Sequence, residues 1–222
     1  MAPPLWRLLQ TTDSLFPTGA FSHSGGLEGL VVDGVLSGAD DGERAIEEIL
    51  FRCFARIDLP ACGLAHRAAA EGDVARLIEI DAGMDSLKAP RELRDAGRSL
   101  GRRRLKVVAA PDAYRRAVEE NRSPGQQAVV TGIHAALEGI SREEALLAYA
   151  FGTASGLVAA AMKLLPLGQT RAQAFLSKLG EDLPARVRSA DDIALEDLGA
   201  FTPVLDIAAM RHETARTRLF IS

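Results

Sequence analysis

The sequence predicts an all-α protein, a single domain of about eight to ten helices around a central buried helix. Apolar residues recur at intervals of three and four through residues 46–57, and residues 145–162 carry no charge. No alternation of apolar and polar residues continues for six positions, and no Asn-Gly or Asp-Gly turn separates two predicted strands. No repeat or low-complexity linker divides the chain, so one domain is the simplest organisation.

The first predicted helix begins within the segment FPTGAFSHSGGLEG, residues 16–29, in which glycine and serine lie between two apolar stretches. A side-chain oxygen at a helix start accepts a hydrogen bond from a backbone amide that has no partner within the helix. We therefore expect Ser22 or Ser24 to cap a helix that begins near Gly25 or Gly26.

An apolar stripe with a period of 3.6 residues predicts the next helix. Asp40 precedes it, and Glu43 three residues later completes the pattern of a capping box. The stripe consists of Ile46, Ile49, Leu50, Cys53, Phe54 and Ile57. Cys53 is therefore expected in the core. Further helices are expected over Asp73–Met84, Pro90–Lys106 and Pro124–Gly139.

The central helix is predicted from a second capping box, Ser141 with Glu144, to Leu165. Pro166 disfavours helical geometry in the residue before it, which places the end there. The uncharged stretch touches the length of a membrane span. Seven of its 18 residues are alanine, and it has no partner span, so a buried helix is favoured over a membrane segment.

Small residues four apart, Gly152, Gly156 and Ala160, lie on one face of this central helix. They allow a neighbouring backbone to approach closely, either inside the core, which is the favoured interpretation, or across a self-association surface. Two more helices are expected, one over Gly168–Leu179 and one opened by Thr202-Pro203, with threonine as cap and proline in the first turn.

Composition indicates a globular protein of ordinary balance. The 222 residues are 47% hydrophobic and 25% charged, and the net charge is −4. This balance does not favour nucleic-acid binding, which usually needs a basic face. The two cysteines make no disulfide framework and fit a reducing compartment. The N-terminal segment lacks the pattern of a signal peptide, so we expect a cytoplasmic protein with no membrane attachment.

The glycine- and serine-rich loop lacks the features of a catalytic site. A phosphate-binding loop needs a following Lys-Ser or Lys-Thr and a preceding strand, and neither is present. Neither Ser22 nor Ser24 has the flanking glycines of a nucleophile elbow. His66, His134 and His212 lie on separate predicted helices, so no acid–base partner is evident. A helical hydrolase is therefore disfavoured.

A metal site is an open alternative. Cys62 and His66 lie at i and i+4 and share a helix face, but two ligands do not close a zinc site. A metal-carrying protein that uses these two residues with His23 is one alternative hypothesis. His23 has a second interpretation, as a turn histidine whose hydrogen bonds are satisfied.

The segment RELRDAGRSLGRRRLK, Arg91 to Lys106, is the strongest basic run. The plain interpretation is a solvated helix face with intrahelical ion pairs. The sharper one is a patch for an acidic protein partner.

The segment MRHETARTRLFIS, residues 210–222, ends with Leu219, Phe220 and Ile221. An apolar tip is poorly placed in water, so it is expected to dock on its own core or on a partner. Arg216 and Arg218 would then anchor it through carbonyl or carboxylate oxygens.

Three motifs together resemble the UreF family of urease accessory proteins. They are DSLFPTGAFSHSGGLE (Asp13 to Glu28), AAAMKLLPLGQ (Ala159 to Gln169) and DIAAMRHETARTRLFIS (Asp206 to Ser222), in family order. The middle segment ELRDAGRSLGRRRL fits less specifically. The resemblance covers nearly the whole chain, and the first and last motifs are the more specific ones.

This resemblance implies an all-helical, usually dimeric protein without catalysis, cofactor or resident metal. Members bind the accessory protein UreD, called UreH in some organisms, and recruit the GTPase UreG. The assembly docks on apo-urease, helps insert nickel and governs when UreG hydrolyses GTP. Segments 1–12 and 214–222 are then expected to be mobile or docked on a partner. A helical scaffold unrelated to urease is a further alternative.

The resemblance also assigns residues. Arg218 is expected to brace the GAFSHS loop, and Lys163 matches a position implicated in communication with UreG. Phe21 stands where the family often has tyrosine, which leaves no phenolic hydroxyl. The residues expected to bind partners are Phe21, Ser22, His23, Ser24, Gly25, Glu28, Lys163, Gln169, Arg211, His212, Glu213, Arg218, Leu219 and Phe220.

Overall fold

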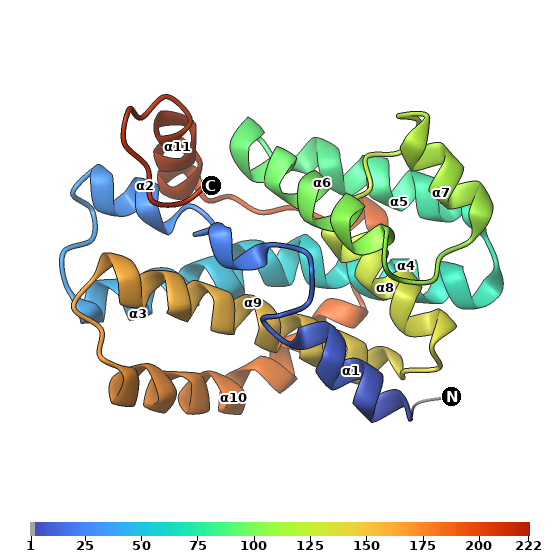
Figure 1. Ribbon diagram of the computed structural model, residues 1–222, viewed down its shortest axis with the longest axis horizontal. Helices are drawn as coiled ribbons and strands as arrows, with labels where there is room; N and C mark the ends of the chain where they lie inside the picture. Colours follow the sequence, from blue (N-terminus) through green and yellow to red (C-terminus); the bar gives the residue numbers. More distant parts are fainter. Residues whose placement is uncertain (1–2) are drawn as a thin grey trace.

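The structure, a computed structural model, describes residues 3–222, and these form helices and loops without a β-strand (Figure 1). The α-helices are α1 (Pro4–Thr12), α2 (Leu27–Val32), α3 (Ala39–Glu48), α4 (Asp58–Glu71), α5 (Val74–Leu87), α6 (Arg91–Leu105), α7 (Asp112–Glu119), α8 (Gln127–Leu137), α9 (Arg142–Leu164), α10 (Gln169–Asp191) and α11 (Pro203–His212). The all-α prediction is confirmed. Helices α1 and α7 form where the sequence pattern indicated none.

Helix α9 is the centre of the arrangement, as predicted. It contacts α1, α2, α3, α4, α8 and α10, and Figure 1 shows it across the middle of the molecule above α10. Its start is the expected capping box, in which Ser141 Oγ accepts from the Glu144 amide at 3.3 Å and Glu144 Oε2 accepts from the Ser141 amide at 3.2 Å. It ends at Leu164, and Leu165 is extended before Pro166.

By length and composition, α9 is the one helix in the described part of the chain that could cross a membrane. Half of its most apolar window is nevertheless buried within the domain. Ala150, Ala154, Val158 and Ala161 are each almost fully covered. The helix thus occupies the place of a core helix, with neighbours on several sides.

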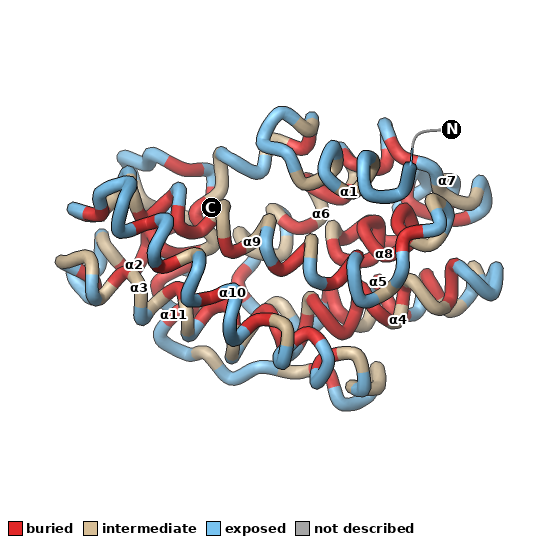
Figure 2. The backbone as a smooth tube through the Cα atoms, turned by 90° about the horizontal axis from the view of Figure 1, so that it is seen from below, coloured by how far each residue is buried: buried red, intermediate tan, exposed pale blue. Residues whose placement is uncertain are grey.

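Helices α4 and α8 make the most extensive helix pair, and a glycine permits it. A Cβ atom built on Gly132 of α8 would lie 2.2 Å from the Cys62 carbonyl oxygen of α4, a distance that no real side chain tolerates. Figure 2 shows buried backbone concentrated along α4 and α8, whereas α1 carries none. The core therefore runs through α4, α8 and α9.

The predicted helix over the apolar stripe is correct in its buried face and wrong in its regularity. Five of the six stripe residues are buried, and Cys53 is half-buried rather than in the core. The α-helix stops at Glu48, and a π-helical turn (Ile49–Cys53) and a 3₁₀ turn (Phe54–Arg56) lead into α4. Such turns rotate the following residues relative to the stripe, which lets one apolar run serve two helices.

Two other boundary predictions need correction, and a third is confirmed in its position but not in its capping bond. The cap of α3 is Gly38, not Asp40, because the carboxylates of Asp40 and Glu43 bind Arg171 of α10 instead. Helix α10 continues past Leu179 and through Pro184 to Asp191. Buried side chains on both sides of the proline offset its missing hydrogen bond. Thr202 is the N-cap residue of α11, with Pro203 at the first position, but its hydroxyl makes no capping bond.

Gly152 and Gly156 do not form the close helix contact that we favoured. No atom lies within 4 Å of a Cβ built on either residue, whereas Ala160 is buried. Both glycines border a cavity beside α9 instead. The alternative of a self-association surface stays a prediction.

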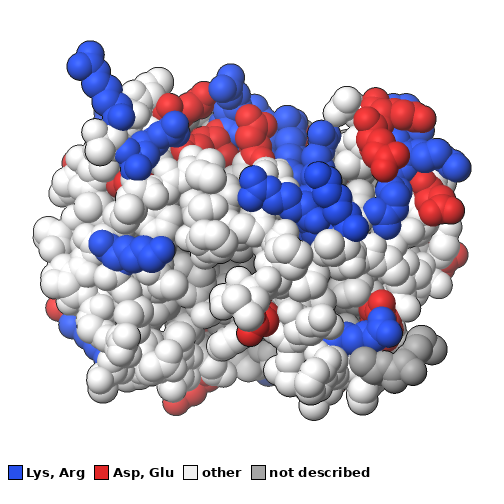
Figure 3. Space-filling view, viewed as in Figure 1, with Lys and Arg blue, Asp and Glu red and all other residues white. Residues whose placement is uncertain are grey.

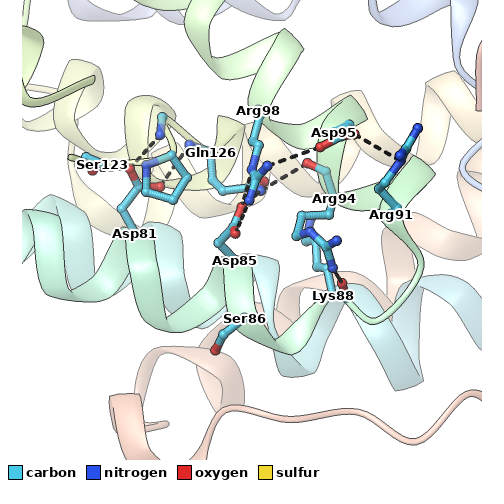
Figure 4. Close-up of polar contacts among 12 residues, drawn as sticks. Asp81, Asp85, Ser86, Lys88, Arg91, Arg94, Asp95, Arg98, Ser123 and Gln126 are labelled. Atoms are coloured by element: carbon cyan, nitrogen blue, oxygen red, sulfur yellow. Dashed lines mark hydrogen bonds and ion pairs between the residues drawn. The ribbon is translucent and has the colours of Figure 1, made fainter. Parts of the chain in front are cut away.

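The basic run of α6 is mostly an internal anchor rather than a solvated face (Figure 4). Arg98 binds Asp85 of α5 through two nitrogens, at 2.6 and 2.7 Å. Arg94 donates to the Lys88 carbonyl at 2.7 Å, and Arg102 to the Pro124 carbonyl at 2.9 Å. Figure 3 shows where Lys and Arg side chains still gather over α6 at the surface. The expected intrahelical ion pairs are present, from Asp95 to Arg91 and Arg98, and Arg91 and Arg103 are exposed. Neighbouring carbonyls and Asp85 hold Arg94, Arg98 and Arg102 at half-buried positions instead of in water.

A buried carboxylate, Asp81, fixes the loop that leads into α8. Its oxygens accept from Tyr114, at 2.9 Å, from Ser123, and from the amides of Gly125 and Gln126 at 2.7 and 2.8 Å. Burial raises the pKa of Asp81, against the opposing effect of these donors. No local sequence pattern indicates this network, because the donors lie 33 to 45 residues after Asp81.

Candidate functional site

The candidate site is the place where residues 219–222 meet the loop before α2. That loop turns at Gly19, forms a 3₁₀ turn (Ala20–Ser22) and turns again at Gly25 and Gly26, both in the left-handed region. Gly26 is the N-cap residue of α2, and Ser24 Oγ accepts from the Glu28 amide at 3.2 Å. The expected serine contact at the helix start is thus present, made by Ser24 from two residues before the cap.

Residues 219–222, here called the tail, bind this loop through backbone and hydroxyl groups. The Ile221 amide donates to the Ser22 carbonyl at 2.8 Å, and Ser24 donates to the Ser222 carbonyl from its amide and from its hydroxyl, the latter at 2.8 Å. His23 Nδ1 lies 2.7 Å from Ser222 Oγ. Burial, and then the charge of Arg103, lower the pKa of His23. The first and last motifs of the sequence therefore form one structural unit.

Glu28, in the first turn of α2, binds the backbone of the tail. Its carboxylate is buried, and its two oxygens accept from the amides of Leu219 and Phe220 at 2.6 and 2.8 Å. His212, at the end of α11, places Nε2 3.0 Å from Glu28 Oε2. The same imidazole places Nδ1 2.8 Å from Glu92 Oε1 of α6. His212 thus lies between two carboxylates and joins α2, α6 and α11.

The structure corrects the expected role of Arg218. Its guanidinium approaches Glu92 Oε1 at 3.5 Å, on α6, rather than bracing the GAFSHS loop. The loop is braced by the tail backbone and by Ser222, because the Glu28 carboxylate and the Ser24 hydroxyl bind the main chain directly. Glu92 and Ser222 belong to the site, and the sequence did not single them out.

Two further ion pairs secure α11 beside the tail. Arg91 Nε lies 3.0 Å from Glu213 Oε1, and Arg211 Nη1 lies 3.0 Å from Asp33 Oδ2. A Cβ atom on Gly29 of α2 would lie 2.6 Å from the Ala208 carbonyl oxygen of α11. The close approach of these two helices therefore requires glycine at this position.

Lys163, near the end of α9, also belongs to the site. Its Nζ lies 5.2 Å from the centroid of the Phe220 ring, a cation–π arrangement, and the ring is buried. Gln169 is exposed at the start of α10 and takes no part in this set of contacts between described residues. The structure thus brings together all the predicted partner-binding residues except Gln169.

The outer side of the unit is apolar and exposed. Phe21 is 70% exposed, Leu219 62% and Ile221 55%. Exposed apolar side chains also occur on α1, at Leu5, Trp6 and Leu9, and on α11, at Val204, Ile207 and Met210. Exposed apolar side chains of this kind are candidates for contact with another protein.

The proposed metal ligands serve packing instead. Cys62 is fully buried in α4, and burial raises the pKa of its thiol to about 12. His66 Nε2 contacts the Ile140 carbonyl at 2.9 Å. Over residues 3–222, no three His, Cys, Asp or Glu side chains are grouped to hold a metal ion. The set of Cys62, His66 and His23 is therefore not assembled.

Comparison with known proteins gives a consistent result. The UreF family model matches residues 36–180. A protein of Bacillus sp. (strain TB-90), named urease accessory protein UreF, is 33% identical over 98% of this chain and 99% of its own length. Proteins with the same name from Arthrobacter sp. (strain FB24) and Haemophilus influenzae (strain ATCC 51907 / DSM 11121 / KW20 / Rd) are 35% and 34% identical, over 97% and 98% of this chain and 96% and 95% of their own lengths.

Proposed function

We propose that this chain, which belongs to the UreF family of urease accessory proteins, assembles the machinery that inserts nickel into urease. In this proposal it bridges a UreD/UreH-type protein and the GTPase UreG, and the assembly docks on apo-urease. It regulates the nickel-loading step by coupling its own binding to the GTPase cycle, without catalysing a reaction. It does so in the cytoplasm, as a homodimer.

The single observation that carries the proposal is the unit formed by the tail and the loop before α2, here called the tail–loop unit. A buried carboxylate, Glu28, holds the tail from within, while Phe21, Leu219 and Ile221 project outward. Polar groups thus fix the geometry, and apolar groups are left on the outer side. Such a preformed surface loses little conformational freedom when a partner binds, which favours affinity.

Lys163 supports a link between the two partners. We assign the tail to the UreD/UreH-type partner and Lys163 to UreG, following the family resemblance. The cation–π contact between Lys163 and Phe220 joins these two regions in one chain. A partner that moves Phe220 would then change the position of the Lys163 ammonium group, which gives coupling a physical route.

Co-purification tests the assignment of the tail. We would express the chain with UreD/UreH-type and UreG-type proteins of one organism and measure the ternary complex by size-exclusion chromatography. Arg218→Ala removes the ion pair with Glu92 and should weaken assembly, whereas Arg188→Ala, an exposed position on α10, should not. Undiminished assembly by the Arg218→Ala variant would contradict the role of the tail.

Lys163→Ala tests the other surface. It should leave the binary complex with the UreD/UreH-type protein intact and reduce both UreG recruitment and the change in GTP hydrolysis on assembly. A GTPase rate that responds to the Lys163→Ala variant as it does to the unaltered chain would remove Lys163 from the proposal. If neither partner binds the unaltered chain, the bridging function itself is wrong.

A further inference from the structure

A cavity of about 340 Å³ lies beside α9. Its lining includes Arg104, Thr131 and His134, which take no part in the tail contacts. Helix α1 and the loop after it form one side, and Gly152 and Gly156 of α9 form another. Residues of α6 and α8 complete the lining. The small side chains of α9 leave this space open, because no atom approaches the two glycines within 4 Å of a Cβ position.

Three polar side chains in the lining are more than nine-tenths buried and have polar atoms without a hydrogen-bond partner. Arg104 of α6 leaves Nε without a partner, Thr131 of α8 its hydroxyl, and His134 of α8 both ring nitrogens. Buried polar groups are nearly always paired with protein, with ordered water or with a bound ligand. Three such groups on one cavity therefore indicate an occupant.

Arg104 carries a charge that the described residues do not balance. Its Nη1 reaches only the Thr11 carbonyl, at 3.4 Å, and its guanidinium carbon lies 5.0 Å from the Phe16 ring centroid. Asp13 is the one carboxylate in the lining, and it is exposed and accepts from the Leu15 amide. Burial lowers the pKa of Arg104 to about 10, so the group remains a cation at neutral pH.

His134 is a neutral donor in this setting. Burial, then Arg104 and Arg7, lower its pKa to about 4. The neutral imidazole offers one N–H group and one acceptor nitrogen. The wall thus presents a guanidinium, a hydroxyl and an imidazole N–H group.

We propose that Arg104, Thr131 and His134 bind a small oxyanion of the carboxylate or carbonate class. A guanidinium matches two oxygens of a planar oxyanion through parallel N–H groups. The threonine hydroxyl and one imidazole nitrogen supply further donors. Chloride has no planar edge, so it should bind more weakly. The proposal does not depend on the partners assigned above.

The test is a titration of the full chain with ¹³C-labelled formate and, separately, ¹³C-labelled bicarbonate. Binding is measured by broadening of the ligand ¹³C signal and by the rise in melting temperature, with potassium chloride holding the ionic strength constant. The unaltered chain should show saturable broadening and a melting temperature above that in chloride alone. Arg104→Met should raise the dissociation constant at least about tenfold.

Two more variants keep the result decisive. Thr131→Val conserves shape, removes one donor and should weaken binding about two- to tenfold, which decides the matter if the Arg104→Met chain does not fold. Arg116→Met, at an exposed position on α7, should bind like the unaltered chain. The proposal fails if broadening does not saturate, if chloride raises the melting temperature equally, or if the folded Arg104→Met or Thr131→Val chain binds as tightly as the unaltered one.

Discussion

Glu28 shows how single residues set the position of the tail. Its side chain lies in the first turn of α2, where a negative charge is favoured by the helix dipole, and it accepts two tail amides. The family resemblance pointed to this residue, but not to the contact that it makes. That contact spans 191 residues of sequence, so no local pattern reports it.

Glu28→Gln should loosen the tail. One carboxylate oxygen becomes an NH₂ group that faces a backbone N–H group, which leaves a buried donor without an acceptor and costs about 1–3 kcal/mol. Hydrogen exchange of the Leu219 and Phe220 amides should accelerate, with protection in α4 unchanged. Glu181→Gln, at an exposed position of α10, is the matched control. Equal protection of the tail amides in both variants would contradict the role of Glu28.

His134 makes stability depend on pH. Its folded-state pKa of about 4 lies below the unfolded value of 6.5, so the unfolded chain binds more protons between these values. The stabilising contribution is complete above pH 6.5 and is lost as the pH falls toward 4, by up to about 3 kcal/mol. In chemical unfolding across this range without added oxyanion, the unaltered chain should lose stability relative to the His134→Gln chain as the pH falls. Parallel pH profiles would show that His134 does not titrate in this way.

At the scale of helices, the close crossing of α2 and α11 determines where the tail begins. Gly29→Ala places a methyl group 2.6 Å from a backbone oxygen, which cannot move as a side chain can. We expect a loss of about 1–3 kcal/mol from overpacking, seen as a lower melting temperature and faster exchange in α11. Gly180→Ala is the control, because α10 has open space there and alanine favours helix by about 0.5–1 kcal/mol. A Gly29→Ala chain as stable as the Gly180→Ala chain would mean that the two helices separate without cost.

The same scale shows what sequence patterns predict and what they miss. The capping box at Ser141 and the stop before Pro166 are local devices, and both predictions are confirmed. Asp40 with Glu43 also resembled a capping box, though less closely, and the Asp40 carboxylate instead binds Arg171, 131 residues away. Helix α10 passes through Pro184 because Leu183 and Val187 are buried against other helices. Tertiary contacts decide such cases, and these contacts cannot be identified from the local patterns of a single sequence.

For the molecule as a whole, the main feature is apolar surface that the fold does not use. Helix α1 has no buried residue, yet it carries Leu5, Trp6 and Leu9 at the surface. The motifs at the two ends of the chain predicted a shared recognition surface, and the structure joins them. The cavity beside α9 was not predicted, because we interpreted the spaced glycines as a sign of close helix packing. A surface of this kind should associate with itself when no partner covers it.

Trp6→Ser tests this expectation for the free chain. Light scattering with size-exclusion chromatography should show that the unaltered chain forms larger species as its concentration rises, and that the variant does so less. Its melting temperature should change little, because an exposed side chain contributes within about 0.5 kcal/mol to folding. Val107→Ser removes an exposed apolar side chain from the loop after α6, so its self-association should match that of the unaltered chain. If the Trp6→Ser chain associates as strongly as the unaltered chain and the Val107→Ser chain, α1 is not part of the self-association surface. The exposed apolar residues of α11 and the tail would then be the next to test.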